Sequence, residues 1–288
     1  MSKESGAGGW LLLIVVVVAI AVCMADPFGW FHEEPIIPNM LTEQGEEVVE
    51  PYQRMKEEEM QEILENAQIG DLISFGVIDN SEYIQWRVLD KEDGKIFVVS
   101  DSLLTVKPFH EKDSENGRYL TITWADSDIR AWLNNELYNS LFDTFEKGRI
   151  LDTEVITPDG VNKNIVSEEV RDGGEDTVDK MFLLSYDEVK KYLPFKEDMI
   201  PSNEIYLEWE NEEIPKIIRV KTGEEYDLKE GIGYNIVNRW WLRTPGSGGT
   251  FFSYVDVLWG DDVEINTQGG IVTEDLGIRP AMWIDVTF

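Results

Sequence analysis

Two short apolar stretches near the C-terminus decide the fold: Arg239-Trp240-Trp241-Leu242-Arg243-Thr244-Pro245-Gly246 and Gly277-Ile278-Arg279-Pro280-Ala281-Met282-Trp283-Ile284. Both combine aromatic and aliphatic residues with arginine and are punctuated by proline or glycine, which is typical of buried strands that stop abruptly. We therefore expect both to be framework strands. The segment between them, residues 247–276, is rich in glycine, aromatic and acidic residues, and it is predicted to form an exposed surface.

Further strands are predicted on both sides of these stretches. In the C-terminal half they cover residues 252–258 and 263–266, with turns at 246–249 and 269–270. Earlier in the chain the pattern predicts strands at 72–75, 83–89, 95–100 and 180–184. An Asp-Gly pair in residues 90–94 has the chemistry of a hairpin turn between the second and third of these.

Helices are predicted where apolar residues recur every three or four positions. The strongest pattern covers residues 128–142, with Ser127 or Asp126 available as N-cap. Shorter helices are predicted at 57–66 and 145–151. Ser185 and Glu188 have the spacing of a capping box, which begins a helix that ends at Pro194.

The separation of strands and helices into runs predicts an α+β fold with an antiparallel sheet. Residues 195–235 look irregular and acidic apart from a strand at 217–221, so they are interpreted as an insertion. The domain is expected to cover residues 67–288.

The N-terminal region has the features of a membrane anchor. Residues 10–31 are apolar almost throughout, and about 20 residues of helix span a bilayer. Because Lys3 precedes this run and acids follow it, residues 1–9 are placed in the cytoplasm and the remainder outside. Residues 32–66 are predicted to be an acidic stalk with a short helix. Cleavage as a signal peptide, followed by secretion, is the alternative.

Composition restricts the partners and the chemistry. The chain carries 57 acidic against 25 basic residues, a net charge of −32, which disfavours nucleic acid as a partner. The single cysteine, Cys23, lies in the apolar run, so the rest of the chain has no thiolate for a metal or redox site. His110 is the only histidine in the body of the chain, and no catalytic constellation accompanies it. We expect the protein not to be an enzyme.

A resemblance adds to this interpretation. The motifs Ile69-Gly-Asp-Leu-Ile-Ser-Phe-Gly76, Trp86-Arg-Val-Leu89 and Ile129-Arg-Ala-Trp-Leu-Asn134 precede Asp172-Gly-Gly-Glu-Asp-Thr177 and the two C-terminal stretches. In this order they resemble a bacterial family of C-type-lectin-like domains of unknown function. The resemblance implies a C-type-lectin-like fold whose C-terminal strands and loops form the exposed face. An oxidase of the formylglycine-generating type shares that fold, but it needs a cysteine pair that this chain lacks.

The candidate ligand-binding residues lie between the two C-terminal stretches. Aromatic rings beside amides and acids are suited to glycan or protein recognition, although alternate strand residues must also face the core. This set comprises Phe251, Phe252, Tyr254, Trp259, Asp261, Asp262, Asn266 and Gln268.

An acidic, glycine-rich loop is the candidate metal site. Carboxylates in such a loop could bind Ca²⁺, or they could cap turns by accepting backbone N–H bonds. The residues are Asp172, Glu175, Asp176 and Asp179. No other cofactor is expected.

The two framework stretches are assigned to structure. An unpaired charge in an apolar strand is costly, so their arginines are expected to bond carboxylates or carbonyl groups in the interior. The structural set is Trp240, Trp241, Arg243, Arg279 and Trp283.

Together these observations predict a module that recognises a glycan or protein at the cell surface. A structural subunit of a surface complex is the alternative, with residues 195–235 making the contact.

Overall fold

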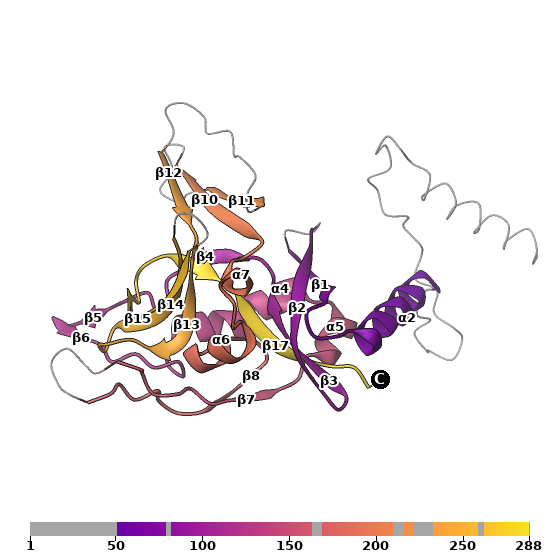
Figure 1. The fold of residues 1–288 in the computed structure, drawn as a ribbon, viewed down its shortest axis with the longest axis horizontal. Coiled ribbons are helices and arrows are strands. Elements are labelled where there is room, and N and C mark those ends of the chain that lie inside the picture. Colours follow the sequence, from indigo (N-terminus) through magenta and orange to yellow (C-terminus); the bar gives the residue numbers. More distant parts are fainter. Residues whose placement is uncertain are drawn as a thin grey trace, which may run out of the picture. The chain divides into compact units, whose positions relative to one another are not determined.

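The computed structural model describes residues 51–78, 82–162, 169–209, 216–221, 233–258 and 262–287 (Figure 1). The chain divides into two units, residues 1–54 and 55–288. Apart from the start of helix α2 (Pro51–Asn66), every described element lies in the second unit. The predicted membrane anchor at 10–31 and the stalk up to residue 50 lie outside the described residues.

The fold class differs from the prediction. Strand residues outnumber helical residues by 43% to 21%, so the domain is mainly β rather than α+β. None of the helices in the described part of the chain combines the length and apolar character that a membrane crossing requires. The prediction of an α+β lectin-like domain is therefore wrong. The transmembrane helix predicted at 10–31 is not among the residues that the structure describes. The balance shifts because segments interpreted as turns or as an irregular insertion are strands.

The first large sheet has the strand order β1-β2-β3-β17-β9, and every pair in it is antiparallel. The predicted hairpin at 90–94 is confirmed, because β2 turns into β3 at Gly94, whose φ of +78° suits glycine. The strands are β1 (Leu72–Ile78), β2 (Glu82–Glu92), β3 (Lys95–Ser100), β9 (Phe182–Leu183) and β17 (Pro280–Asp285).

The second large sheet has the order β15-β14-β13-β16-β4 and contains both C-terminal stretches. Only the β13–β16 pair is parallel among its described pairs. The predicted turn at 269–270 is wrong, because β15 continues through both glycines to Ile271. The strands are β4 (Thr105–Lys107), β13 (Arg239–Pro245), β14 (Phe251–Val257), β15 (Val263–Ile271) and β16 (Leu276–Ile278).

The two sheets are joined by one bent ladder. β3 pairs with β17 in the first sheet. The strand after β3, which is β4, pairs in the second sheet with the strand before β17, which is β16. Arg279 lies at the bend between β16 and β17, and its fully buried guanidinium donates to the carbonyl of Ser100 at 2.8 Å. The second framework stretch is thus two strands in different sheets rather than one.

Residues 195–235 are not an irregular insertion. They contribute α7 (Lys196–Met199) and a three-stranded antiparallel sheet of order β11-β10-β12, which lies beside β4 in Figure 1. The strands are β10 (Asn203–Trp209), β11 (Lys216–Lys221) and β12 (Gly233–Val237). Ile205 and Leu207 belong to the main core at a spacing of two residues, which is the physical reason that this segment forms a strand. The predicted strand at 217–221 is confirmed.

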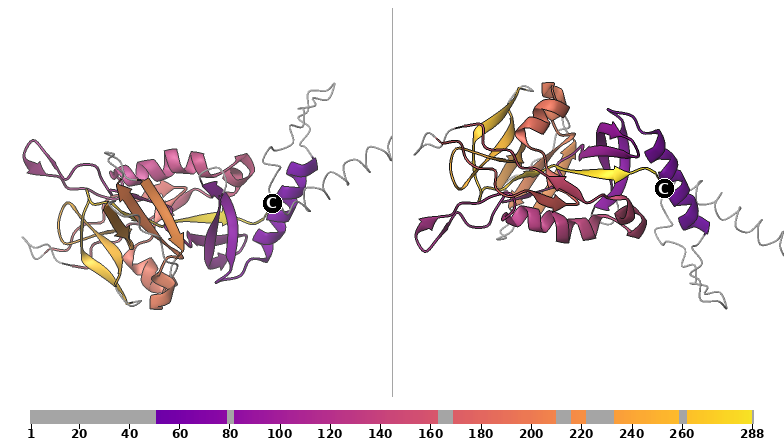
Figure 2. Two further views of the ribbon diagram at one scale, coloured as in Figure 1. Left: turned by 90° about the horizontal axis from the view of Figure 1, so that it is seen from above. Right: turned by 90° about the horizontal axis from the view of Figure 1, so that it is seen from below.

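The predicted helices are confirmed, with refinements. The helix at 128–142 consists of α3 (Asp128–Trp132), a π-helical turn (Leu133–Leu137) and α4 (Tyr138–Leu141), and Ser127 is its N-cap. Helices α5 (Thr144–Arg149) and α6 (Tyr186–Tyr192) follow, and α6 begins with the predicted capping box. The views in Figure 2 show α3 and α4 on one side of β17 and α6 and α7 on the other.

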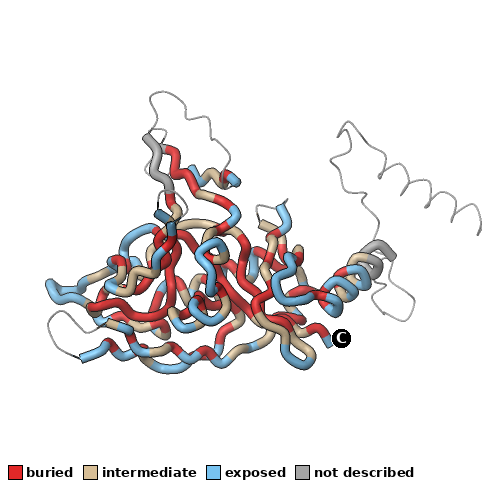
Figure 3. Tube along the Cα trace, in the orientation of Figure 1, coloured by how far each residue is buried: buried red, intermediate tan, exposed pale blue. Residues whose placement is uncertain are grey.

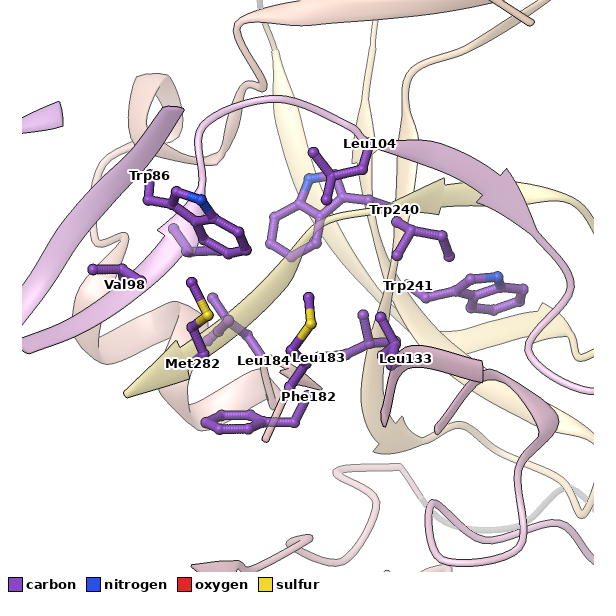
Figure 4. Packing of buried hydrophobic residues seen from close by; sticks show 14 of the residues in the cluster. Trp86, Val98, Leu104, Leu133, Phe182, Leu183, Leu184, Trp240, Trp241 and Met282 are labelled. Carbon is purple, nitrogen blue, oxygen red and sulfur yellow. The ribbon is translucent and has the colours of Figure 1, made fainter. Parts of the chain in front are cut away.

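A single core runs through both large sheets. Figure 3 shows β13, β14 and β17 buried along most of their length. In Figure 4, Trp86 from the first sheet and Trp240 from the second lie in one cluster with Leu133 from the π-helical turn. Because the two sheets share this core, the loops at the ends of the second sheet have a rigid support.

Candidate functional site

Two of the predicted ligand-binding aromatics are core residues. Phe252 is fully buried, with its ring stacked on that of Phe109 at 3.7 Å between centroids. Tyr254 is 8% exposed and meets Trp241 edge to face. Alternate residues of β14 were expected to face the core, and the structure goes further: every residue from Phe252 to Asp256 is buried, because both faces of the strand are covered.

Asn266 supports the backbone beside these aromatics. Its amide nitrogen donates to the Tyr254 hydroxyl at 3.0 Å, and its oxygen accepts the Gly269 N–H at 3.1 Å. Gly269 has a φ of +93°, so Asn266 holds the one residue of β15 that has a left-handed backbone. Burial raises the pKa of Tyr254, which is therefore neutral at pH 7.

The remaining predicted ligand residues are at the surface or outside the described chain. Gln268 is exposed on β15, while Phe251 is half-buried against Gly248. Asp262 is exposed and forms an ion pair with Lys196, whose hydrogen bond lowers the pKa of Asp262. Trp259 and Asp261 lie outside the described residues.

The acidic loop does not gather its carboxylates at one point. Asp179 is buried and accepts hydrogen bonds from Arg130 at 2.7 Å and from the Trp124 indole at 3.0 Å. Glu175 and Asp176 face solvent, and Asp172 accepts the Gly174 N–H at 2.8 Å. Within the described residues, no group of three or more His, Cys, Asp or Glu side chains is arranged to hold a metal ion.

Arg243 and Arg279, the two arginines assigned to structure, make several interior bonds. Arg243 donates to the carbonyl oxygens of Leu183 at 2.6 Å and Ile156 at 3.0 Å, and it pairs with Glu188 at 2.8 Å. Arg279 lies over the Trp240 ring at 5.2 Å. Burial lowers the pKa of Arg279 to about 10, so it is charged at pH 7. Trp240 and Trp241 are fully buried, whereas Trp283 is half-exposed.

One end of the second sheet is built from loops that pack backbone to backbone. A Cβ on Gly160 would lie 2.9 Å from the Pro245 oxygen, and a Cβ on Gly249 would lie 2.7 Å from the Leu120 oxygen. Between these loops, buried Arg171 donates to the Ile122 carbonyl oxygen. Glycine is required here because the backbones approach too closely for a side chain.

A hairpin extends from this end of the sheet. Its strands are β5 (Ser114–Glu115) and β6 (Arg118–Tyr119), and Asn116 and Gly117 both have positive φ, as a type I′ turn requires. Tyr119 is 81% exposed. The hairpin is fixed to the loops just beyond β6, where the Ile122 N–H donates to the Gly249 carbonyl at 3.0 Å.

We call Tyr119, Gly248, Phe251 and Gln268 the loop-end surface. Phe251 packs on Gly248, and the Gln268 carbonyl accepts the Ser247 N–H at 2.9 Å, so three strand ends meet there. The hairpin joins this end of the sheet through Leu120, whose carbonyl oxygen would lie 2.7 Å from a Cβ on Gly249. The sequence interpretation missed the hairpin, although the Asn116-Gly117 pair is a recognised turn signal.

His110 takes part in packing at the start of α3. Its Nδ1 lies 3.0 Å from an Asp128 carboxylate oxygen and 3.3 Å from the Asp128 backbone nitrogen. An imidazole so placed can cap the helix and does not, by this geometry, identify a reacting centre.

The fold and the site define a β-rich domain with two sheets on a common core and a rigidly supported loop surface. The chain belongs to the DUF6273 family, a domain of unknown function, which residues 93–286 match. No curated protein and no solved structure matches the chain. The resemblance to a domain of unknown function is thus confirmed, whereas no relationship to C-type-lectin-like domains is found.

Proposed function

We propose that this protein is a non-enzymatic recognition module that binds a glycan or a protein through the loop-end surface. The observation that carries the proposal is Tyr119, a large aromatic side chain that is 81% exposed on a hairpin fixed to rigid loops. Tyrosine on a preorganised support gives contact area with little loss of conformational entropy.

The neighbouring groups are compatible with such a role. Phe251 adds a second, half-buried aromatic ring, and Gln268 adds an exposed amide that can donate and accept hydrogen bonds.

We further propose that recognition takes place outside the cytoplasm. This part of the proposal rests on the sequence of residues 10–31, an apolar run preceded by Lys3 and followed by acids. Cell fractionation combined with protease treatment of intact cells would test it, since a cytoplasmic domain would be protected.

Assembly into a larger complex is the second candidate function. Strand β11 has a partner on one side only among the described strands, and its exposed ends carry Lys216 and Lys221. A basic edge strand on a chain of net charge −32 suits an acidic strand from a neighbouring subunit.

The proposed function is tested with the full chain on a glycan array and in pull-down experiments with surface extracts. Tyr119→Ala is expected to lower affinity for a captured ligand by about 30-fold, the effect of removing an interface residue worth about 2 kcal/mol. Tyr83→Ala is the matched control, because Tyr83 is a 50% exposed tyrosine on β2, in the other large sheet.

Equal binding by the Tyr119→Ala and Tyr83→Ala proteins would exclude the loop-end surface. If no glycan binds and a protein partner is lost only when Lys216 and Lys221 are both changed to glutamate, assembly through β11 is the function.

A further inference from the structure

A pocket of about 290 Å³ lies between the first sheet and the segment that follows α5, and it shares no residue with the loop-end surface. Trp283 of β17 and Lys95 of β3 line one side, and residues 151–154 line the other. The Leu151 N–H donates to the Trp283 carbonyl at 2.9 Å, which fixes this segment against β17. The pocket therefore has a defined shape.

The Trp283 ring packs against a neighbouring aromatic ring and also contacts a cation. Phe97, its cross-strand neighbour, packs at 5.0 Å between ring centroids with an interplanar angle of 23°. The Lys95 ammonium lies 4.3 Å from the Trp283 ring centroid and 2.9 Å from a Glu92 carboxylate oxygen. The protein itself thus shows how an alkylammonium group is accommodated here, by an aromatic face and a carboxylate.

The opposite side of the pocket adds two more carboxylates. Asp152 is already paired with Lys180, at 3.1 Å. Glu154 is exposed, lines the pocket and makes no ion pair with any described residue. Among the described residues, one carboxylate of the pocket therefore has no cationic partner, and it lies in the same pocket as a half-buried tryptophan.

We propose that this pocket binds a primary ammonium group on an alkyl stem, as in a lysine side chain or a free alkylamine. The ammonium would lie between the Trp283 ring and the Glu154 carboxylate, in competition with Lys95. The net charge of −32 favours the approach of a cation over that of an anion. Because both Lys95 and Trp283 are partly exposed, displacing the lysine costs little.

The test follows the indole N–H signal of Trp283 by NMR in the full chain. Trp283→Phe identifies that signal by its disappearance. Titration with n-butylammonium is expected to shift it in a saturable way, whereas n-butanol, which has the same alkyl chain and no charge, is not. A parallel titration uses N-acetyl-lysine-methylamide in place of butylammonium. The probe that binds with the higher affinity shows whether a free amine or a lysine side chain is preferred.

Two substitutions should change affinity in opposite directions. Lys95→Gln removes the internal competitor and should tighten butylammonium binding by about two- to fivefold, the range that exposed cation–π contacts correspond to. Glu154→Gln removes the negative charge of this carboxylate and should weaken binding by a similar factor. Lys112→Gln and Glu58→Gln make the same charge changes at exposed positions that do not line the pocket, and they should leave affinity unchanged.

The proposal is overturned if butanol shifts the Trp283 signal as much as butylammonium does. It is also overturned if neither cationic probe binds, or if the pocket variants behave like their controls, because general electrostatic attraction would then account for the result. The two proposals can fail separately, since the two sites share no residue. Tyr119→Ala should weaken binding at the loop-end surface without changing the affinity of the pocket for butylammonium.

Discussion

Arg243 connects three segments of the chain through a single side chain. Its guanidinium bonds the carbonyls of Leu183 and Ile156 and the Glu188 carboxylate, which in turn accepts the Ser185 N–H in the capping box of α6. Arg243 is only 3% exposed, so these groups depend on it rather than on water. Arg243, the second arginine of the first framework stretch, thus holds β9, β13 and α6 together.

Replacing this arginine should destabilise the fold severely. Arg243→Met keeps the length of the aliphatic stem but leaves Glu188 and two carbonyls without their donor, which we expect to cost about 3 kcal/mol of unfolding free energy. Urea denaturation measures the change. Arg118→Met, at an exposed position of the hairpin, should stay within about 0.5 kcal/mol of the parent. A loss below about 1 kcal/mol for Arg243→Met would contradict the role described.

A carboxylate at the C-terminal end of β17 should make stability depend on pH. Hydrogen bonds from the hydroxyl and the backbone N–H of Thr287 lower the pKa of Asp285. A carboxylate with a lowered folded pKa contributes stability above its unfolded pKa of about 4, and this stability is lost as pH falls through the folded pKa.

Asp285→Asn removes that contribution. We expect the difference in unfolding free energy between parent and variant to be largest near neutral pH and to shrink between about pH 5 and pH 3. Urea denaturation across this range provides the measurement. A difference that is constant with pH would show that the ionised carboxylate is not responsible.

At the scale of elements, the fold depends on loops that approach one another without intervening side chains. A Cβ on Gly173 would lie 2.2 Å from the Thr157 carbonyl oxygen, and these two loops run beside β7 (Thr153–Val155) and β8 (Thr177–Asp179). A backbone oxygen cannot move aside as a flexible side chain can. The close approach therefore specifies glycine at this position.

Two glycine substitutions should have opposite effects for this reason. Gly173→Ala is expected to lower the melting temperature, because the loops must separate to admit a methyl group. Gly148→Ala, at an exposed position of helix α5 with no atom within 4 Å of the added Cβ, should raise stability by about 0.5–1 kcal/mol. Calorimetry of both variants checks the pair, and a stabilised Gly173→Ala protein would be incompatible with the described packing.

At the scale of the whole molecule, charge is the dominant property. The chain has a net charge of −32, and such an excess opposes the compact state through self-repulsion. Raising NaCl from about 0.01 M to 0.15 M shortens the screening length from about 30 Å to about 8 Å. Screening lowers the repulsion energy of the compact folded state more than that of the unfolded chain, because the charges of the folded state are closer together.

The melting temperature should therefore rise with NaCl concentration, by about 2–4 °C for each 1 kcal/mol that screening recovers in a domain of this size. A neutral osmolyte at the same osmolality serves as the control for non-electrostatic effects. A melting temperature that falls with added NaCl would mean that attractive ion pairs outweigh the repulsion.

Local features were predictable because their physical causes are local. The capping box at Ser185 and Glu188, the Asp-Gly turn before β3 and the apolar period of residues 128–142 each depend on a few neighbouring residues. Strands β10 and β12 were missed, because acidic residues interrupt the apolar pattern of 203–209 and only tertiary packing buries Ile205 and Leu207.

The sequence by itself determined that two C-terminal apolar stretches form framework strands, that Arg243 and Arg279 need interior partners, and that the chain is strongly acidic. Only the tertiary structure decided that Phe252 and Tyr254 face the core, that Tyr119 is exposed, and that Lys95, Glu154 and Trp283 line one pocket. The reason is physical: composition and periodicity report which residues are apolar, but the order of strands in a sheet decides which of them are covered.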